Sequence, residues 1–270
     1  MTRRLFLPLL AFLALVSCRA GRNYIDPIAP RWVGPAPAVP TVASDTLRVV
    51  SFNIQYARNI DSALAVLGDS ALRGADIVLL QEMDAVGTQR IAAALRMGYV
   101  YYAAISARRT HRDFGNAILS RWPIEEDDKV ILPHPAQFDG SQRIAAAATI
   151  RAGGRRVRVY STHFGTIADI GPDRRRGQLD AIMRDAERYD HVIIGGDMNS
   201  GSVGEHAVAS GYAWPTPGLR TARFGLRYDH FFLRGLHLAG PDAVGVVEDV
   251  RGSSDHRPIW AWIVTGPSIG

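Results

Sequence analysis

The sequence contains a single cysteine, Cys18, so the chain cannot form a disulfide bond within itself. It has no internal repeat, and it lacks the Gly-x-Ser-x-Gly motif that presents a serine nucleophile in many hydrolases. The fold must therefore be stabilised by its core. Hydrophobic residues make up 47% of the chain, the usual level for globular proteins, and 270 residues suffice for one large domain or two small ones.

The N-terminus also lacks the run of about 20 apolar residues that a membrane-spanning helix needs. Residues 1–17 instead combine arginines, a short apolar stretch and small residues, which is typical of a signal peptide. They lead into Leu-Val-Ser-Cys, which resembles a bacterial lipobox and predicts lipid modification of Cys18. An ordinary cleaved signal or a short membrane anchor is the alternative. The paired arginines are also compatible with twin-arginine export.

Residues 18–45 are predicted to be a tether, because proline favours extended chain and removes backbone donors. The prolines of this segment are Pro27, Pro30, Pro35, Pro37 and Pro40. The tether would hold the domain, residues 46–266, off a membrane. We therefore expect an exported, membrane-anchored lipoprotein, located at the outer membrane, in the periplasm or on the cell surface, and monomeric.

The chain carries a formal net charge of +5, and most of its positive charge is arginine. A basic surface favours partners that are rich in phosphate, such as nucleic acid or anionic lipid head groups. The alternative interpretation is a solvated basic face without a specific partner.

Apolar patterning predicts a mixture of strands and helices within the domain. A hairpin across Gly153-Gly154 joins two of the strands, and Gly74 is a candidate helix C-cap. Several strands are apolar on both faces and the helices are few, which fits two packed sheets with helices outside. The predicted helices are 61–73, 88–97 and 173–189. The predicted strands are 47–53, 77–81, 99–104, 116–120, 143–151, 157–163, 191–197, 228–233 and 259–264.

Polar side chains follow several of these apolar runs. The run 192–199 ends in Gly-Gly-Asp-Met-Asn, which places Asp197 and Asn199 on one face at the end of a buried strand. Taken singly, such a motif is equally compatible with a turn, a loop cap or a surface charge. Together, the oxygen ligands and the imidazole predict a hard divalent cation and an activated water. The other side chains in comparable positions are Asn53, Glu82, Asp255 and His256.

In this order the motifs resemble the endonuclease/exonuclease/phosphatase superfamily, which includes deoxyribonucleases, abasic-site endonucleases, neutral sphingomyelinases and inositol-polyphosphate 5-phosphatases. The resemblance runs from about Leu47 to Val264 and implies a four-layer α/β sandwich with the site at one end of the paired sheets. It is carried by Ser-Phe-Asn-Ile at 51–54, Gln-Glu at 81–82, Gly-Asn-Ala-Ile-Leu-Ser at 115–120, Ser-Thr-His-Phe at 161–164, Gly-Asp-Met-Asn at 196–199, Tyr-Asp-His-Phe at 228–231 and Ser-Asp-His-Arg-Pro at 254–258.

The resemblance implies Mg²⁺ or Mn²⁺ as cofactor and a role for each residue. Glu82 is the main metal ligand, while Asn53 and Asp255 support the metal directly or through water. Asp197 orients or deprotonates the attacking water, and Asn199 fixes Asp197 and the phosphate.

The remaining roles concern the phosphoryl and leaving groups. The resemblance assigns His256 to the phosphoryl group, with Asp229 as the carboxylate that sets its tautomer and charge. His163 protonates or stabilises the leaving oxygen. Arg143 contacts the phosphate, and Asn116 either does so, props the site, or only starts a strand.

Motifs that the sequence lacks disfavour some substrate classes of the superfamily. The signature of the 5-phosphatase branch is absent, and His163 stands where abasic-site endonucleases use a tyrosine. Two phosphodiester substrates remain for an exported enzyme. Nucleic acid is favoured by the basic charge and by the loop 108–112. A phospholipid or sphingolipid head group at the membrane is favoured by the anchor, but no long apolar insertion is present. A catalytically silent binding lipoprotein is disfavoured because the constellation is intact.

Overall fold

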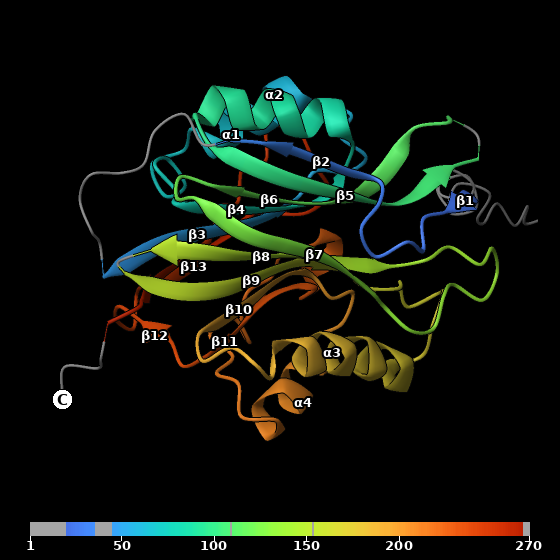
Figure 1. Ribbon diagram of the computed structural model, residues 1–270. Coiled ribbons are helices and arrows are strands. Elements are labelled where there is room, and N and C mark those ends of the chain that lie inside the picture. The colour runs from blue at the N-terminus through green and yellow to red at the C-terminus, as the bar shows by residue number, and fades with distance from the viewer. Residues whose placement is uncertain (1–19, 36–44, 109, 153, 267–270) are drawn as a thin grey trace, which may run out of the picture.

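Two β-sheets lie face to face, and helices cover their outer surfaces (Figure 1). Helices α1 (Ile60–Leu67) and α2 (Ala85–Leu95) cover one sheet. Helices α3 (Pro172–Ala186) and α4 (Val203–Ala209) cover the other. This arrangement confirms the expected four-layer α/β sandwich. The computed structural model describes residues 20–35, 45–108, 110–152 and 154–266.

The larger sheet of the described chain is mixed: β3 and β4 run parallel, whereas the other neighbours are antiparallel. Its order is β1-β5-β6-β4-β3-β14-β12, with β2 beside β5 and β13 beside β14. The strands are β1 (Ala20–Asn23), β2 (Arg31–Gly34), β3 (Thr46–Asn53), β4 (Ile77–Met83), β5 (Gly98–Ala107), β6 (Asp113–Ser120), β12 (His237–Leu238), β13 (Val244–Val246) and β14 (Ile259–Val264).

The smaller sheet has the order β11-β10-β9-β8-β7 and is also mixed, because β9 and β10 run parallel. The predicted hairpin is confirmed as the antiparallel pair β8 and β9. The strands are β7 (Ile124–Ile131), β8 (Ile144–Ala152), β9 (Arg155–His163), β10 (Val192–Asp197) and β11 (Asp229–Arg234).

The core between the sheets is apolar and tightly packed. Leu79 of the larger sheet and Phe231 of the smaller one are buried in the same cluster. A Cβ added to Gly195 would lie 2.5 Å from Leu79 Cδ1 and 2.9 Å from Phe231 Cδ1. The next residue, Gly196, has φ +144°, and a Cβ there would lie 2.0 Å from the Thr162 carbonyl oxygen. Gly195 therefore lets the two sheets approach each other beside the site, while Gly196 allows the close approach of the neighbouring strand β9 within its own sheet.

One polar link crosses this apolar layer. Gln81 Nε2 donates to Ser161 Oγ at 3.0 Å, and Ser161 Oγ donates to the Leu80 carbonyl oxygen at 3.1 Å. All these groups are buried. Because a buried polar group without a partner is costly, this pair holds the two sheets in register just below the strand ends.

Helix α1 is shorter than the sequence predicted. It ends at Leu67 with Gly68 as its C-cap, and turns follow up to Gly74. The Asp69 backbone carbonyl accepts hydrogen bonds from Leu72 and Arg73 in these turns. The expected helix end at Gly74 is therefore wrong.

The predicted tether is wrong for residues 20–34, which form β1 and β2. Both strands pair with β5 at the edge of the larger sheet. The pairing uses backbone groups, and Pro27 and Pro30 lie in the connection between the strands, where no ladder donor is needed. The predicted signal peptide, Cys18 and residues 36–44 lie outside the described residues. Within the described chain, no helix is long and apolar enough to cross a membrane.

Candidate active site

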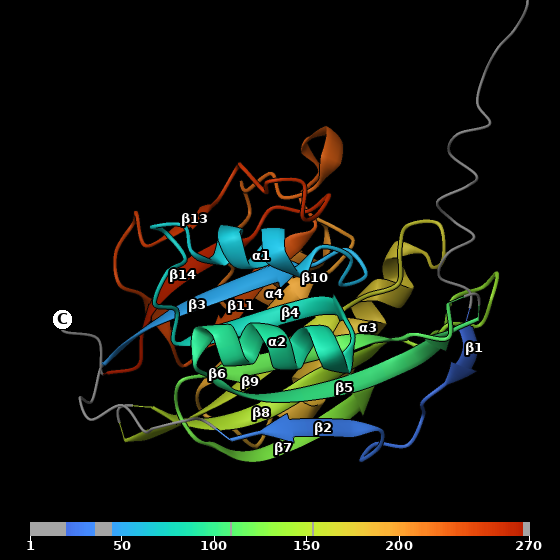
Figure 2. The same cartoon turned by 90° about the horizontal axis from the view of Figure 1, so that it is seen from above.

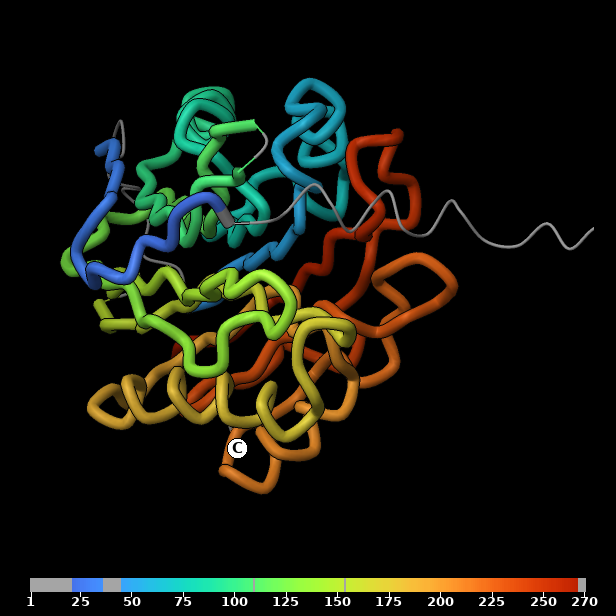
Figure 3. Tube along the Cα trace, turned by 90° about the vertical axis from the view of Figure 1, so that its right-hand side faces the viewer, coloured from blue at the N-terminus to red at the C-terminus, as the bar shows by residue number. Residues whose placement is uncertain are grey.

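The carboxyl ends of β3, β4, β9 and β10 meet at one end of the sandwich. Each sheet contains a parallel pair, and Asn53 at the end of β3 hydrogen-bonds Asp197 at the end of β10. Figure 2 shows β3 and β4 pointing to this end, and Figure 3 looks onto it. A cavity of about 290 Å³ opens there. Most of the predicted site residues line it, namely Glu82, Arg143, His163, Asp197, Asn199, Asp255 and His256.

Asn53 connects carboxylates from the two sheets. Its Nδ2 donates to Glu82 Oε1 and to Asp197 Oδ2, both at 3.1 Å. Its Oδ1 accepts from the Gln55 backbone at 3.0 Å, which fixes the orientation of the amide. Asn53 is fully buried beneath the cavity. It therefore positions the two acidic groups and keeps them apart without facing the substrate.

Glu82 points into the cavity because β4 carries a bulge at this position. The pairing with β6 shifts register between Leu80 and Met83, and Glu82 has φ +57°. A bulge re-aims a side chain and is common beside active sites. The Tyr56 backbone amide donates to Glu82 Oε2 at 3.0 Å and completes the fixation of the carboxylate.

The donor set of this wall fits a hard divalent cation. Burial raises the pKa of Glu82, and the charge of Asp255 raises it further, while Asn53 and His256 oppose the shift. Two carboxylates close together in a desolvated wall favour a bound cation. Their ligand atoms are oxygens, which Mg²⁺ and Mn²⁺ prefer. Glu82 and Asp255 are the residues that would hold such an ion.

A second group, Asp197, Asp229 and His256, could also hold a metal ion, since its ligand atoms lie within 4.8 Å of one another. In this group His256 Nδ1 already bonds Asp229 Oδ2 at 2.8 Å. A histidine must be neutral to bind a metal ion, whereas the two carboxylates beside His256 favour its protonated, charged ring. The group is therefore better suited to proton transfer and anion binding.

His256 is held as a cation by its neighbours. Burial lowers the pKa of His256, but the charges of Asp229 and Asp197 outweigh burial and raise the pKa well above its ordinary value. Ser254 positions the segment: its Oγ accepts from the His256 backbone amide at 3.0 Å and donates to the Asn53 carbonyl oxygen at 2.6 Å. The Nε2 of His256 consequently faces the cavity with a proton to donate.

Asp197 is the central carboxylate. Burial raises its pKa to about 7, with Asp229 and Glu82 adding to the effect and His256 opposing it. Its Oδ1 accepts from the Asn199 backbone amide at 2.8 Å, and Asn199 Nδ2 is engaged with the Phe164 carbonyl oxygen at 3.1 Å. A carboxylate with a pKa near neutrality is suited to accept a proton from water.

His163 is neutral and has a defined tautomer. Burial lowers its pKa well below the ordinary value, and the charges of Arg143 and His256 act in the same direction. Arg143 Nη1 lies 3.3 Å from His163 Nδ1. Because arginine only donates, Nδ1 accepts and the proton sits on Nε2, 3.4 Å from Asp197 Oδ2. His163 can therefore donate a hydrogen bond but does not carry a charge.

The two predicted substrate-binding residues differ in position. Arg143 lines the cavity, with Nη2 3.7 Å from Asp169 Oδ2 and its guanidinium over the Phe114 ring. Asn116 does not line the cavity, because its Nδ2 is bound to the Ile144 carbonyl oxygen at 2.9 Å. Asn116 therefore supports the backbone at Ile144, the residue next to Arg143.

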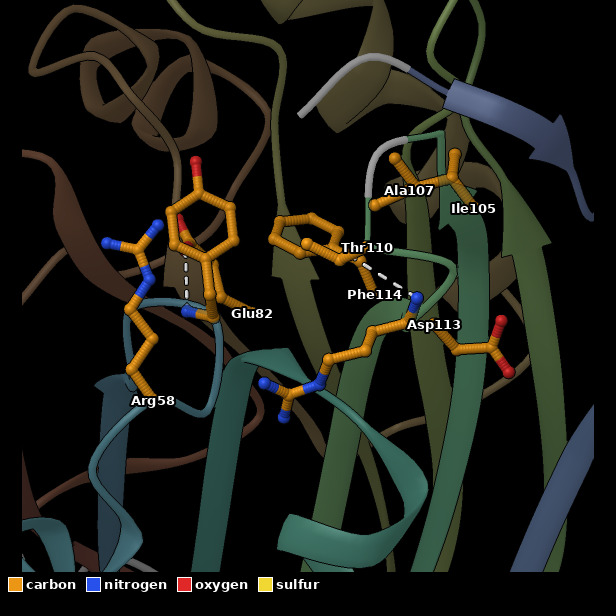
Figure 4. A pocket seen from close by; sticks show the side chains of 9 residues that line it. Arg58, Glu82, Ile105, Ala107, Thr110, Asp113 and Phe114 are labelled. Atoms are coloured by element: carbon orange, nitrogen blue, oxygen red, sulfur yellow. Dashed lines mark hydrogen bonds between the residues drawn. The ribbon is translucent and has the colours of Figure 1, made fainter. Parts of the chain in front are cut away.

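Several residues around the cavity were not predicted from the sequence, including Tyr56, Phe114 and Asp169. None of them follows a strand as part of a polar motif, so no sequence signal marked them. A smaller hollow of about 70 Å³ adjoins the cavity and shares Glu82 with it. Figure 4 shows Arg58 and Phe114 on either side of Glu82 in this hollow.

Residues 50–256 match the Endonuclease/Exonuclease/phosphatase family, and the chain belongs to that family. No curated protein sequence matches it. The family assignment confirms the resemblance in the motifs and gives the chain a hydrolase fold of the phosphodiesterase and nuclease type. Its members generally use a divalent metal.

Solved structures share the fold at low sequence identity. An endonuclease/exonuclease/phosphatase from Bacteroides vulgatus superposes with a TM-score of 0.66 at 17% identity, covering 81% of this chain and 98% of that one. TDP2 of D. rerio, complexed with a single-strand DNA product, gives 0.64 at 17% identity, covering 82% and 99%. Sphingomyelinase C from Streptomyces griseocarneus gives 0.59 at 19% identity, covering 80% and 99%.

Proposed function

We propose that this protein is a divalent-metal-dependent phosphodiester hydrolase in which water attacks phosphorus in line with the leaving oxygen. The observation that carries the proposal is the position of Asp197, whose Oδ2 lies 3.4 Å from His163 Nε2 and 3.6 Å from His256 Nε2. One group of near-neutral pKa is thus flanked by a neutral donor and a cationic donor. General base catalysis and electrostatic stabilisation need this combination.

Each residue has a defined task in the reaction. Asp197 takes the proton of the attacking water, whose oxygen forms the new bond to phosphorus as the bond to the leaving oxygen breaks. His256, charged through Asp229, donates to a phosphoryl oxygen. His163 donates from Nε2 to the leaving oxygen. A cation held by Glu82 and Asp255 would stabilise the negative charge that develops on the phosphoryl group.

Nucleic acid outside the cytoplasm is the first substrate candidate. It is supported by the basic charge of the chain and by Arg58 and Arg112 beside the cavity. The shared fold with TDP2, which was complexed with a DNA product, is compatible with this assignment. Arg112 is partly committed, because it forms an ion pair with Asp84.

A phospholipid or sphingolipid phosphodiester is the second candidate. The fold is shared with sphingomyelinase C, and the proposed lipid on Cys18 would keep the enzyme at a membrane. On this proposal the protein is an exported, monomeric lipoprotein at the outer membrane or cell surface. Mass spectrometry of Cys18 in membrane extracts tests the lipid directly, and an unmodified thiol would refute it.

A substrate panel tests the activity. It contains plasmid DNA, single-stranded DNA, RNA, sphingomyelin and glycerophosphodiesters, each with Mg²⁺, Mn²⁺ or EDTA. Metal-dependent cleavage that is lost in Asp197→Asn supports the proposal and identifies the substrate class. Turnover that persists in EDTA, or in the variant, contradicts the mechanism.

A further inference from the structure

Large apolar side chains are exposed on loops around the active-site cavity. Phe138, Ile167 and Phe224 are 78%, 64% and 97% exposed. Each of these loops also supplies a cavity-lining residue, namely Asp139, Thr166 and Tyr228, so the three loops border the site. In Figure 3 the three loops cross the face from the yellow-green loop at its middle, past the yellow loop, to the orange loop at the right. We call these three residues the rim tips.

Phe224 is the most exposed of the rim tips and has an unusual backbone. It lies in the short turn Arg223–Gly225 with φ +60°, a left-handed conformation that is uncommon for a bulky residue. Such conformations concentrate at functional positions. The turn is tied to the catalytic histidine, because Ala222 forms a β-bridge with His256.

Unpaired positive charge accompanies the exposed ring. Arg220, Arg223 and Arg227 are exposed on the same loop, and none of them forms an ion pair with a carboxylate of the described chain. No acidic residue occurs between Trp214 and Tyr228. An exposed aromatic ring among arginines, as at Phe224, suits a surface that is apolar inside and anionic outside, which describes the head-group region of an anionic membrane.

The N-terminal strand places the start of the chain at the same end of the molecule. Ala20 pairs with Ala107, which lines the hollow beside Glu82. Asn23 bonds Gly140 and Gln142 in the loop that carries Phe138. Cys18 precedes Ala20 by two residues, which span about 7 Å when extended. A lipid on Cys18 would therefore bring this end of the molecule to the membrane.

We propose that the active-site end docks on an anionic lipid membrane, with Phe138, Ile167 and Phe224 entering the interface and the arginines of the Phe224 loop contacting head groups. Docking favours the second substrate candidate, a phosphodiester of a membrane lipid, because it presents that lipid directly to the cavity. This inference rests on the proposed phosphodiesterase function for its substrate, while the docking itself depends only on the surface.

Docking is tested with the full-length lipidated protein. Single cysteines replace Phe138, Ile167, Phe224 or, as a control, Val208, and each is labelled with an environment-sensitive fluorophore. Val208 is 53% exposed and lies on α4, in the outer helix layer. It is therefore an exposed apolar residue like the rim tips, but it lies away from the cavity. Cys18 does not react when its thiol carries lipid. The protein is inserted into phosphatidylcholine vesicles with and without phosphatidylglycerol.

At the rim tips we expect blue-shifted emission and several-fold stronger quenching by brominated lipid than at Val208, with a larger effect in the anionic vesicles. Equal quenching by aqueous iodide at all four positions would overturn docking. Rim-tip labels that respond to single-stranded DNA but not to lipid would overturn it in favour of nucleic acid.

Activity separates docking from chemistry. In the variant Phe138→Ala/Ile167→Ala/Phe224→Ala, turnover of phospholipid in vesicles should fall about tenfold, whereas turnover of soluble bis(p-nitrophenyl) phosphate should change by less than about twofold. Equal loss on both substrates would contradict a docking role. If the wild-type lipidated protein hydrolyses neither substrate, the proposed phosphodiesterase function fails. The fluorescence experiment still decides whether this face docks on the membrane.

Discussion

Asp197 lies between two histidines whose protonation states differ. Its Oδ2 is 3.4 Å from His163 Nε2 and 3.6 Å from His256 Nε2. Burial dominates at His163 and lowers its pKa, while the carboxylates around His256 raise the pKa of that ring. A single carboxylate thus faces one neutral and one charged donor.

Asp197→Asn should reduce turnover by about 10²–10⁴-fold, because the amide cannot accept a proton from water. Its similar size preserves packing, so the circular dichroism spectrum should not change. Asp180→Asn is the matched control, since Asp180 also pairs with a histidine, His206, but far from the cavity. A control that loses as much activity as Asp197→Asn would refute the assignment.

Asp229→Asn should move the alkaline limb of the pH–rate profile to lower pH. Asp229 is the strongest of the groups that raise the pKa of His256, so its removal lowers that pKa and the ring loses its proton earlier as the pH rises. The measurement is the profile of kcat/KM against pH. An unchanged alkaline limb would show that His256 does not act as a cation.

The contribution of Asp197 to the stability of the metal-free protein should fall as the pH rises from about 4 to about 7. The pKa of Asp197 is raised from 3.8 to about 7 in the folded state, so the folded state binds the proton more tightly than the unfolded chain. This contribution is complete below the unfolded pKa and disappears above the folded one. Urea unfolding of the EDTA-treated wild type and of Asp197→Asn isolates it, because the stability of the wild type relative to the variant should fall over this pH range. A difference that does not change with pH would refute the raised pKa of Asp197.

Glu82→Gln should abolish the thermal stabilisation that Mg²⁺ or Mn²⁺ confers on the folded protein. A ligand that binds only the folded state raises stability by about 2.7 kcal/mol at a hundred times its Kd, and removal of the carboxylate removes this binding. The test is the melting temperature against metal concentration. Glu205→Gln, at an exposed position on α4, should retain the full response. A metal-induced shift that survives in Glu82→Gln would place the ion elsewhere.

Gly196→Ala should destabilise the fold by more than about 1 kcal/mol, since φ +144° and a Cβ 2.0 Å from the Thr162 carbonyl oxygen are both unfavourable. Chemical denaturation measures the loss. Gly240→Ala, where a Cβ meets no atom within 4 Å, is the control and should change stability little.

Much of the fold could be predicted from apolar runs. The strand predicted at 259–264 coincides with β14, and the predicted strand 77–81 lies within β4. The missed elements carry weaker patterns. Strand β7 reads Ile-Glu-Glu-Asp-Asp-Lys-Val-Ile, which is too charged to be recognised as a strand. β2 pairs with β5 through backbone groups that any residue possesses.

The sequence by itself determined the chemical inventory of the site. Asn53 and Asp197 end buried strands and His256 lies just before one, so all three could be identified without coordinates from polar motifs beside apolar runs. Their protonation states could not, because a pKa depends on distances and burial among side chains from separate segments. Only the tertiary structure decided that His163 is neutral, that His256 is charged, and that the rim tips and the N-terminal strand share one face. Those relationships arise when distant segments pack together, and local sequence does not encode them.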